Sequence, residues 1–210
     1  MKVAHESEAP AVVGQRGPVE HERREQIITA ADAHFRRYGY DKTTVADLAR
    51  AIGVSSGYVY RFFESKQAIG EAICGMTLGK VDAGLHDISR RETAAAERMR
   101  QVYLYLVDRG VELFFSERKL HDIVVAAMEA NWCAINRHEK AILDVVRKIV
   151  ADGREAGEFE RKTPIDEVCR AIVETLVPFS NPALLTKSER EQLGANATAV
   201  ASLVLRSLAP

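Results

Sequence analysis

Cysteines and long apolar segments are scarce in this chain of 210 residues. Its three cysteines, Cys74, Cys133 and Cys169, lie far apart and form no Cys-x-x-Cys pair. This spacing argues against a disulfide framework and a thiolate metal site, so we expect reduced, mostly buried thiols, with a redox-sensing thiol as the alternative. We recognise no signal peptide and no apolar run long enough to span a bilayer, which predicts a cytoplasmic protein without membrane contact.

Excess charge of either sign is also missing. Lysine and arginine number 29 against 30 aspartate and glutamate residues, which gives a formal net charge of −1. Proteins that bind nucleic acids usually present a basic surface, so the composition as a whole does not favour that function. A positive face would have to arise from local placement, and the basic residues available for it are Arg23, Arg24, Lys42, Arg61 and Lys66.

The sequence shows none of the arrangements that enzymes use. It has no nucleophile placed with a general base, no glycine-rich phosphate loop and no ligand-spaced group of His, Cys, Asp or Glu. His121 precedes Asp122 and His138 precedes Glu139, but no further ligand is spaced to complete a metal site with either pair. We therefore expect no catalytic residues, no metal and no cofactor.

The sequence does contain a pattern of two short helices joined by a glycine corner, TTVADLARAIGVSSGYVYRFFESK, at residues 43–66. An apolar stripe predicts the first helix, and Thr44 followed by Asp47 predicts a capping box at its start. Gly53 suits the left-handed conformation that ends a helix, and Ser55 suits the cap of the next helix. Together these features predict a helix-turn-helix. The stripe consists of Val45, Leu48, Ala49 and Ile52.

The second helix of this pattern, expected over residues 56–63, has two different faces. One arc carries Ser56, Gly57, Tyr60 and Arg61, and the opposite arc carries Val59, Phe62 and Phe63, with Tyr58 on the border. Small residues at the start of the first arc would let the helix approach DNA closely, while Arg and Tyr can reach a base edge or a phosphate. An ordinary helical hairpin with a solvated outer face is the alternative.

Flanking segments extend the pattern. A helix that starts at Pro18 and ends at Gly39 is expected upstream, and Ser65 is expected to cap a helix downstream. In this context IITAADAHFRRYGYDKTTVADLARAIGVSSGYVYRFFESKQAI resembles the DNA-binding domain of TetR-family transcriptional regulators. The resemblance covers roughly residues 20–70 and rests on F-x-x-x-G-Y-x-x-T-T, D-L-A-x-x-I-G-V-S, G-x-x-Y-x-x-F and the following S-K.

The resemblance implies DNA contacts for particular residues. Thr44 would touch a phosphate at the start of the first motif helix. The residues that would read the major groove are Ser55, Ser56, Gly57 and Tyr58, and those that would contact the backbone are Tyr60 and Lys66. Arg61 and Phe62 depart from the family's usual pattern, so we expect Phe62 to turn inward and Arg61 to gain a phosphate or base contact.

The resemblance also implies the fold class and the domain organisation. We expect an all-α protein in which a flexible N-terminal arm, residues 1–18, precedes a three-helix helix-turn-helix DNA-binding domain, residues 19–66. A fourth helix would link from residue 66 to about residue 82. Residues 83–210 would form a larger helical ligand-binding and dimerisation domain.

Two sets of residues in this larger domain are candidates for function. In the family the last two long helices pair across a two-fold axis, and the residues that would form this seam are Ala171, Val173, Leu176, Ala199, Val200, Leu203 and Val204. The candidates for an effector pocket are Tyr103, Phe114, Met128, Trp132, His138 and Phe179. The alternative for both sets is an ordinary place in the monomer core.

The resemblance therefore implies a homodimeric transcriptional regulator, in the first instance a repressor, that binds a palindromic operator in double-stranded DNA. A small hydrophobic or amphipathic effector would release it by changing how the two DNA-binding domains are spaced, because both recognition helices must enter successive major grooves. A helical interaction module, or an activator without a small-molecule effector, is the alternative.

Overall fold

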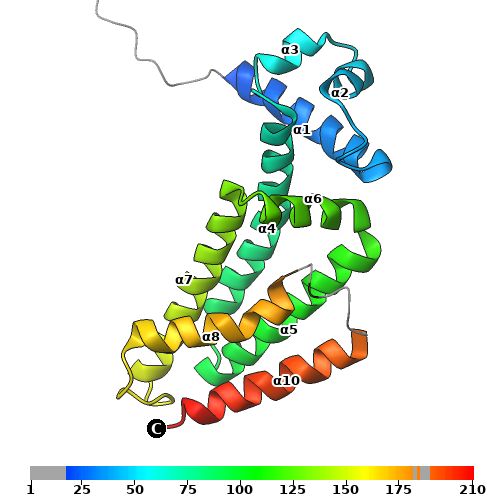
Figure 1. The fold of residues 1–210 in the computed structure, drawn as a ribbon. Coiled ribbons are helices and arrows are strands. Elements are labelled where there is room, and N and C mark those ends of the chain that lie inside the picture. Colours follow the sequence, from blue (N-terminus) through cyan, green and yellow to red (C-terminus); the bar gives the residue numbers. More distant parts are fainter. Residues whose placement is uncertain (1–17, 182–183, 185–189) are drawn as a thin grey trace, which may run out of the picture.

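The computed structural model describes residues 18–181, 184 and 190–210, so the expected flexible arm lies, apart from Pro18, outside the described residues. The described chain contains helices and turns but no strand, which confirms the all-α fold class (Figure 1). None of its helices is both long and apolar enough to cross a membrane. The helices are α1 (Pro18–Tyr38), α2 (Val45–Ala51), α3 (Ser56–Tyr60), α4 (Lys66–Ser89), α5 (Ala95–Ser116), α6 (Arg118–Glu129), α7 (Cys133–Glu155), α8 (Ile165–Ser180) and α10 (Arg190–Ser207).

Helices α1, α2 and α3 form a unit at one end of the molecule (Figure 1). Thr44 caps α2 and Ser55 caps α3, as the sequence predicts. Gly53, between the two helices, has a φ of 71°, a left-handed conformation that residues with a side chain rarely adopt. The buried side chains at the centre of the unit include Phe35, Leu48 and Val59.

Helix α3 is shorter than the sequence pattern predicts. It ends at Tyr60, whereas the expected helix continued to residue 63. The N–H groups of Phe62 and Phe63 both donate to the carbonyl oxygen of Val59 in the turn that follows. This turn carries Phe63 into the core, where it is 3% exposed, and leaves Phe62 half-buried.

Helix α4 joins the N-terminal unit to a bundle formed by α5, α7, α8 and α10 (Figure 1). It continues to Ser89, past the end near residue 82 that the sequence suggested. Helix α4 packs mainly along α7, and α10 packs mainly along α5, with a smaller contact to α8. Apolar side chains from all these helices form the core of the bundle, and its largest fully buried members include Leu85, Met99, Tyr103, Ile149 and Leu176.

Helix α6 lies between the N-terminal unit and the bundle, where it contacts both α1 and α4 (Figure 1). Its buried residues Leu120, Ile123 and Ala127 belong to the same apolar cluster as Phe35 and Leu48 of the N-terminal unit. Since this core is continuous, a displacement of α6 would reach the N-terminal unit through direct side-chain contact.

Candidate nucleic-acid interface and internal cavities

The start of α2 is fixed by a complete capping box. Thr44 Oγ1 donates to Asp47 Oδ2 at 2.6 Å, and the Asp47 N–H donates to Thr44 Oγ1 at 3.2 Å. The hydrogen bonds from the Thr44 side chain and backbone hold the pKa of the Asp47 carboxyl below its ordinary value. The Thr44 hydroxyl is therefore already engaged, so a DNA phosphate at this position would compete with Asp47.

Helix α3 presents an open surface. Gly57 is exposed, and among the described residues a β-carbon added there would find only Ser55 Oγ within 4 Å, at 3.9 Å. Tyr60 is 52% exposed, Ser55 and Arg61 are also exposed, and Ser56 is half-buried. Most of the residues expected to meet DNA are therefore accessible around α3.

Tyr58 and Lys66 already have partners within the chain. The half-buried Tyr58 ring lies 5.3 Å from the Phe62 ring, and the Arg61 guanidinium lies within about 6 Å of both rings. Lys66 Nζ donates to the Tyr40 carbonyl oxygen at 3.1 Å and lies 4.3 Å from the centre of the Tyr40 ring. An ammonium group has three N–H donors, so Lys66 retains donors for a phosphate.

A shallow depression of about 470 Å³ beside α2 adds basic side chains to this end of the molecule. His34, Lys42 and Arg50 line it, and the Arg50 side chain is 77% exposed with an ion pair to Asp47 at 3.1 Å. Lys42 is among the basic residues that the sequence predicts for a positive face, whereas Arg50 is not. Its position in the last turn of a short helix that follows the Thr44 cap was the available signal.

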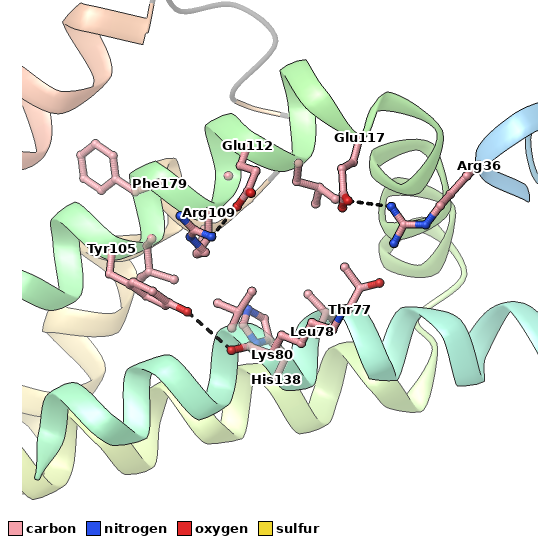
Figure 2. A pocket seen from close by; sticks show the side chains of 15 residues that line it. Arg36, Thr77, Leu78, Lys80, Tyr105, Arg109, Glu112, Glu117, His138 and Phe179 are labelled. Carbon is pink, nitrogen blue, oxygen red and sulfur yellow. Dashed lines mark hydrogen bonds and ion pairs between the residues drawn. The ribbon is translucent and has the colours of Figure 1, made fainter. Parts of the chain in front are cut away.

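A cavity of about 300 Å³ lies among α4, α5, α7 and α8 and reaches the end of α1 (Figure 2). We call it the charged cavity, because its lining includes Arg36, Lys80, Arg109, Glu112 and Glu117. Arg36 and Glu117 form an ion pair at 2.6 Å, and Arg109 pairs with Glu112. The apolar part of its wall includes Leu78, Val81, Leu106, Leu113 and Phe179.

A second cavity of about 280 Å³ adjoins the first across Leu78, His138 and Ser180, which line both. We call it the apolar cavity, since most of its wall is aliphatic. His138 is fixed within the shared wall, with Nδ1 2.5 Å from Asp82 Oδ1. The aliphatic residues of the apolar cavity include Val124, Met128, Ile135, Ile142, Val173, Leu176 and Val177.

The residues expected at an effector pocket are only partly brought together. Phe179 lines the charged cavity, Met128 lines the apolar cavity and His138 lines both. Tyr103 and Phe114 are absent from both linings. Tyr103 is fully buried with its ring edge-on to Phe179, and the Phe114 ring packs against side chains of α6. The charged lining residues could not be predicted from the sequence, because they come from helices far apart in the chain and meet only in the folded protein.

Trp132, expected in the effector pocket, lies elsewhere in the structure. Its side chain is 4% exposed, and its ring centre lies 5.7 Å from that of Tyr40 in the N-terminal unit. A β-carbon added to Gly70 would lie 2.9 Å from the Trp132 ring, so the indole packs closely against α4. Trp132 lines neither cavity and instead joins the N-terminal unit to the start of α7.

The expected dimer seam also needs correction. Leu176 and Val204 are 1% and 8% exposed and pack in the core of the bundle, so they are not available to a partner helix. The outward-facing members of the predicted set are Ala171, Ala199 and Leu203, and the half-buried members are Val173 and Val200. Val177 of α8, which is not in the predicted set, is 37% exposed and lines the apolar cavity.

The thiols and acidic groups offer no evident metal site. Among the described residues, no group of three or more His, Cys, Asp or Glu side chains could hold a metal ion. All three cysteines are free thiols, two buried and Cys133 exposed. Burial raises the pKa of Cys74 to about 12, which keeps that thiol protonated and unreactive at neutral pH.

Two family models match this chain. Residues 27–73 match the model described as bacterial regulatory proteins, tetR family, and residues 95–201 match the model described as Tetracyclin repressor-like, C-terminal domain. The HTH-type transcriptional repressor Rv1474c of Mycobacterium tuberculosis is 47% identical over 47 residues, which cover 22% of this chain and 25% of that repressor. This chain therefore matches only about a quarter of the length of that relative.

Solved structures share the fold over nearly the whole chain. A TetR-family regulator from Pectobacterium atrosepticum has a TM-score of 0.74 at 18% identity, with 92% of this chain and 98% of that chain covered. FadR from Bacillus subtilis, solved in complex with stearoyl-CoA, has a TM-score of 0.62 at 19% identity, with 88% and 98% covered. At these identities the likeness shows the fold alone. The family models, which match the helix-turn-helix unit and most of the bundle, show that the chain belongs to the TetR family of DNA-binding transcriptional regulators.

Proposed function

We propose that this regulator is a homodimeric repressor that binds a palindromic operator through α3 and leaves it when a small amphipathic effector binds in the bundle. The observation that carries the DNA-binding part is the open face of α3 around Gly57. This face lies on a helix whose start is fixed by the hydrogen bond that the Tyr58 N–H donates to Ser55 Oγ at 3.2 Å. A fixed helix with small, exposed residues can enter the major groove without rearranging its own side chains.

Within this proposal the residues around α3 divide between positioning and sequence reading. Gly57 and Ser56 allow close approach to the bases, while Arg61 and Tyr60, both exposed, reach base edges or phosphates. Thr44 and Lys66 contact phosphates, which do not carry sequence information. Tyr58 keeps its ring against Phe62 and offers mainly its hydroxyl to the groove.

Dimerisation is supported by the apolar residues that α8 and α10 leave exposed. Leu203 of α10 is 62% exposed, and the exposed small residues Ala171 of α8 and Ala199 of α10 would let partner helices approach closely. Pairing of these two helices with their copies would bury the exposed apolar side chains and fix the separation of the two α3 helices. That separation must match successive major grooves, about 34–36 Å apart.

Effector binding is supported by the two adjoining cavities, whose volumes of about 300 and 280 Å³ suit a small molecule. The apolar cavity favours a hydrophobic portion and the charged cavity a polar portion. Stearoyl-CoA bound to the Bacillus subtilis relative has both portions in one molecule. Since α6 borders both the bundle and α1, a ligand that displaces it would change the placement of the N-terminal unit.

The experiment is footprinting of the purified protein on the intergenic DNA upstream of its own gene. The proposal expects two protected half-sites related by a palindrome and separated by one helical turn or a multiple of it. Protection that is lost on adding an amphipathic ligand supports effector release. Protection that no ligand relieves would favour an activator or repressor without an effector, and the absence of any protected site in the genome would favour a helical interaction module.

A further inference from the structure

The charged cavity reaches the DNA-binding unit itself. Arg36 lies in the last turn of α1, next to the fully buried Phe35, and its guanidinium borders the cavity (Figure 2). Its Nη1 donates to Glu117 Oε1 at 2.6 Å, and its Nε donates to Asp32 Oδ2 at 2.8 Å. A ligand in this cavity would therefore meet a side chain of the DNA-binding unit directly.

Glu117 stands at the junction between two helices. It follows the last residue of α5 and precedes the first residue of α6, with a φ of −127° that belongs to neither helix. The Arg36–Glu117 ion pair thus connects α1 to the point where α5 turns into α6. Both side chains are more than one-third exposed, at 38% and 37%, so a competing anion has access to the pair.

The lining of the charged cavity has more cations than carboxylates, although Asp32, which is outside the lining, also pairs with Arg36. The lining contains three cations, Arg36, Lys80 and Arg109, against two carboxylates, Glu112 and Glu117. The Arg109 side chain is 42% exposed and one of its terminal nitrogens pairs with Glu112, but its Nε is buried and has no acceptor among the described residues. Lys80 has no ion pair within the part of the chain that the structure describes. A buried, unpaired guanidinium N–H is costly unless a ligand or solvent accepts its hydrogen bond.

We propose that the effector is an amphipathic anion whose head group binds Arg109 and replaces Glu117 at Arg36. The proposal rests on the proposed function and names the chemical class of its effector. The head is a carboxylate or phosphate, which can accept hydrogen bonds from two guanidinium groups at once. The apolar chain extends past Leu78 and His138 into the apolar cavity, whose wall supplies aliphatic contacts.

This exchange explains how ligand binding changes the affinity of the protein for DNA. When the head group takes the place of Glu117, α1 loses its ion pair to the α5–α6 junction and the head group holds Arg36 instead. The ligand then has different contacts in the two placements of the N-terminal unit, which is the condition for shifting an equilibrium between them. Because coupling is reciprocal, operator DNA should weaken binding of the anion by the same factor.

The head group is tested with three probes that share a twelve-carbon chain: dodecanoate, dodecanoyl-CoA and 1-dodecanol. Each probe is titrated into the full-length protein on fluorescent operator DNA, and its direct binding is measured by calorimetry. We expect the carboxylate or the CoA ester to lower operator affinity at least about tenfold, while the alcohol binds at least about tenfold more weakly than the better anion. The stronger of the two anionic probes identifies the source of the negative charge.

Single substitutions separate binding of the head group from its effect on DNA. Arg109→Gln should weaken anion binding about tenfold and leave the coupling factor intact at saturation. Arg36→Gln removes one of the two guanidinium groups that hold the head group, so it should weaken anion binding to the free protein and also reduce the coupling factor towards one. Glu117→Gln removes the carboxylate that the head group displaces, so it should bind the anion at least as tightly as the wild type while its coupling factor also falls. Arg37→Gln is the matched control, because Arg37 adjoins Arg36 on α1 but does not line the cavity.

The possible outcomes distinguish the two proposals. Equal release of DNA by dodecanol and the anions would overturn the anionic head group while leaving an effector-controlled repressor in place. Full coupling in Arg36→Gln would overturn the exchange at Arg36. Failure of all three probes to bind or to release DNA would overturn this inference. A different result would contradict the effector part of the proposed function: that no ligand of any class removes the protein's protection of the operator DNA.

Discussion

At the scale of single residues, Gly70 shows how closely the N-terminal unit and the bundle are joined. A β-carbon at this position would lie 2.8 Å from Tyr40 Cε2 and 2.9 Å from Trp132 Cη2. Tyr40 belongs to the loop that leads to α2, and Trp132 directly precedes α7, so three separate segments meet at one glycine of α4. The absence of a side chain at Gly70 allows this meeting.

Replacing Gly70 with Ala should destabilise the protein by about 1–3 kcal/mol, because the buried Trp132 ring and the half-buried Tyr40 ring would have to shift. The matched control is Gly79→Ala on the same helix, where no side chain of the described residues lies within 4 Å of the added β-carbon. There the better helix propensity of Ala should stabilise the protein by about 0.5–1 kcal/mol. Urea unfolding of both variants measures the difference, and equal midpoints would contradict the close packing at Gly70.

Asp152 predicts a dependence of stability on pH. Burial alone would raise the pKa of this carboxyl, but hydrogen bonds from Arg98 at 2.7 Å and Lys148 at 3.0 Å outweigh it and lower the pKa. The stabilising contribution is therefore complete above the ordinary value of 3.8 and is lost as the pH falls through the lower folded value. Thermal unfolding between pH 7 and pH 3 should show a smaller acid-induced decrease for Asp152→Asn than for the wild type. Parallel curves for the two proteins would contradict this role.

At the scale of elements, the features predicted best from the sequence are those that depend on residues close together in the chain. The Thr44 capping box, the Ser55 cap and the left-handed Gly53 each depend on residues within one or two turns, and all are confirmed. The end of α3 was predicted too far along the chain, because the turn after Tyr60 is set by the burial of Phe63 in tertiary contacts. Local signals thus located the motif helices but not the point where packing ends one of them.

The same dependence on tertiary packing explains why several candidate residues in the bundle were placed wrongly. Helical periodicity identifies an apolar face but not whether that face meets its own core or another chain. Leu176 and Val204 therefore looked like seam residues although both are buried within the protomer. Similarly, an aromatic residue such as Trp132 gives no sign in the sequence that its partner is Tyr40, far away in the N-terminal unit. The charged cavity was not predictable, because Arg36 and Glu117 meet only in the folded chain.

The loop-to-helix junction at α4 gives a prediction for Lys66. If its ammonium binds a phosphate, Lys66→Ala should weaken binding to operator and to random duplexes by the same factor. The slope of log affinity against log salt should also fall by about one unit. Fluorescence anisotropy at several salt concentrations measures both quantities. An unchanged slope would mean that Lys66 binds no phosphate. Its role would then be limited to Tyr40, whose carbonyl oxygen accepts its hydrogen bond at 3.1 Å and whose ring it also contacts.

At the scale of the whole molecule, the proposed dimer requires the bundle to place two DNA-binding units at a fixed separation. In this proposed dimer the exposed apolar residues of α8 and α10 would supply the surface for pairing, and the charged cavity lies among the bundle helices and reaches the end of α1. Helix α6 contacts α1 as well as α4, α5 and α7, and its buried residues share one apolar cluster with the N-terminal unit. A ligand, the dimer and the DNA would therefore act on the same connected set of helices.

Leu203→Asp should disrupt the dimer without unfolding the protomer, because this side chain is 62% exposed within a single chain. We expect the dimer dissociation constant to rise at least about a hundredfold, which corresponds to about 2.8 kcal/mol. Met76→Asp on α4 is the control, since Met76 is 47% exposed but lies outside the proposed seam. Sedimentation velocity measures both variants. A Leu203→Asp dimer as tight as the wild type would contradict the assignment of the seam.

The central claim, that the open face of α3 reads the operator, is tested most directly by Gly57→Leu. Fluorescence anisotropy should compare the wild type and the variant on an operator duplex and on a scrambled duplex of the same composition. Because space around Gly57 is open in the free protein, the variant should keep its circular dichroism spectrum, its melting temperature and its dimer. We expect it to lose its preference for the operator while its affinity for the scrambled duplex changes little. An unchanged preference for the operator in a folded Gly57→Leu dimer would contradict the account.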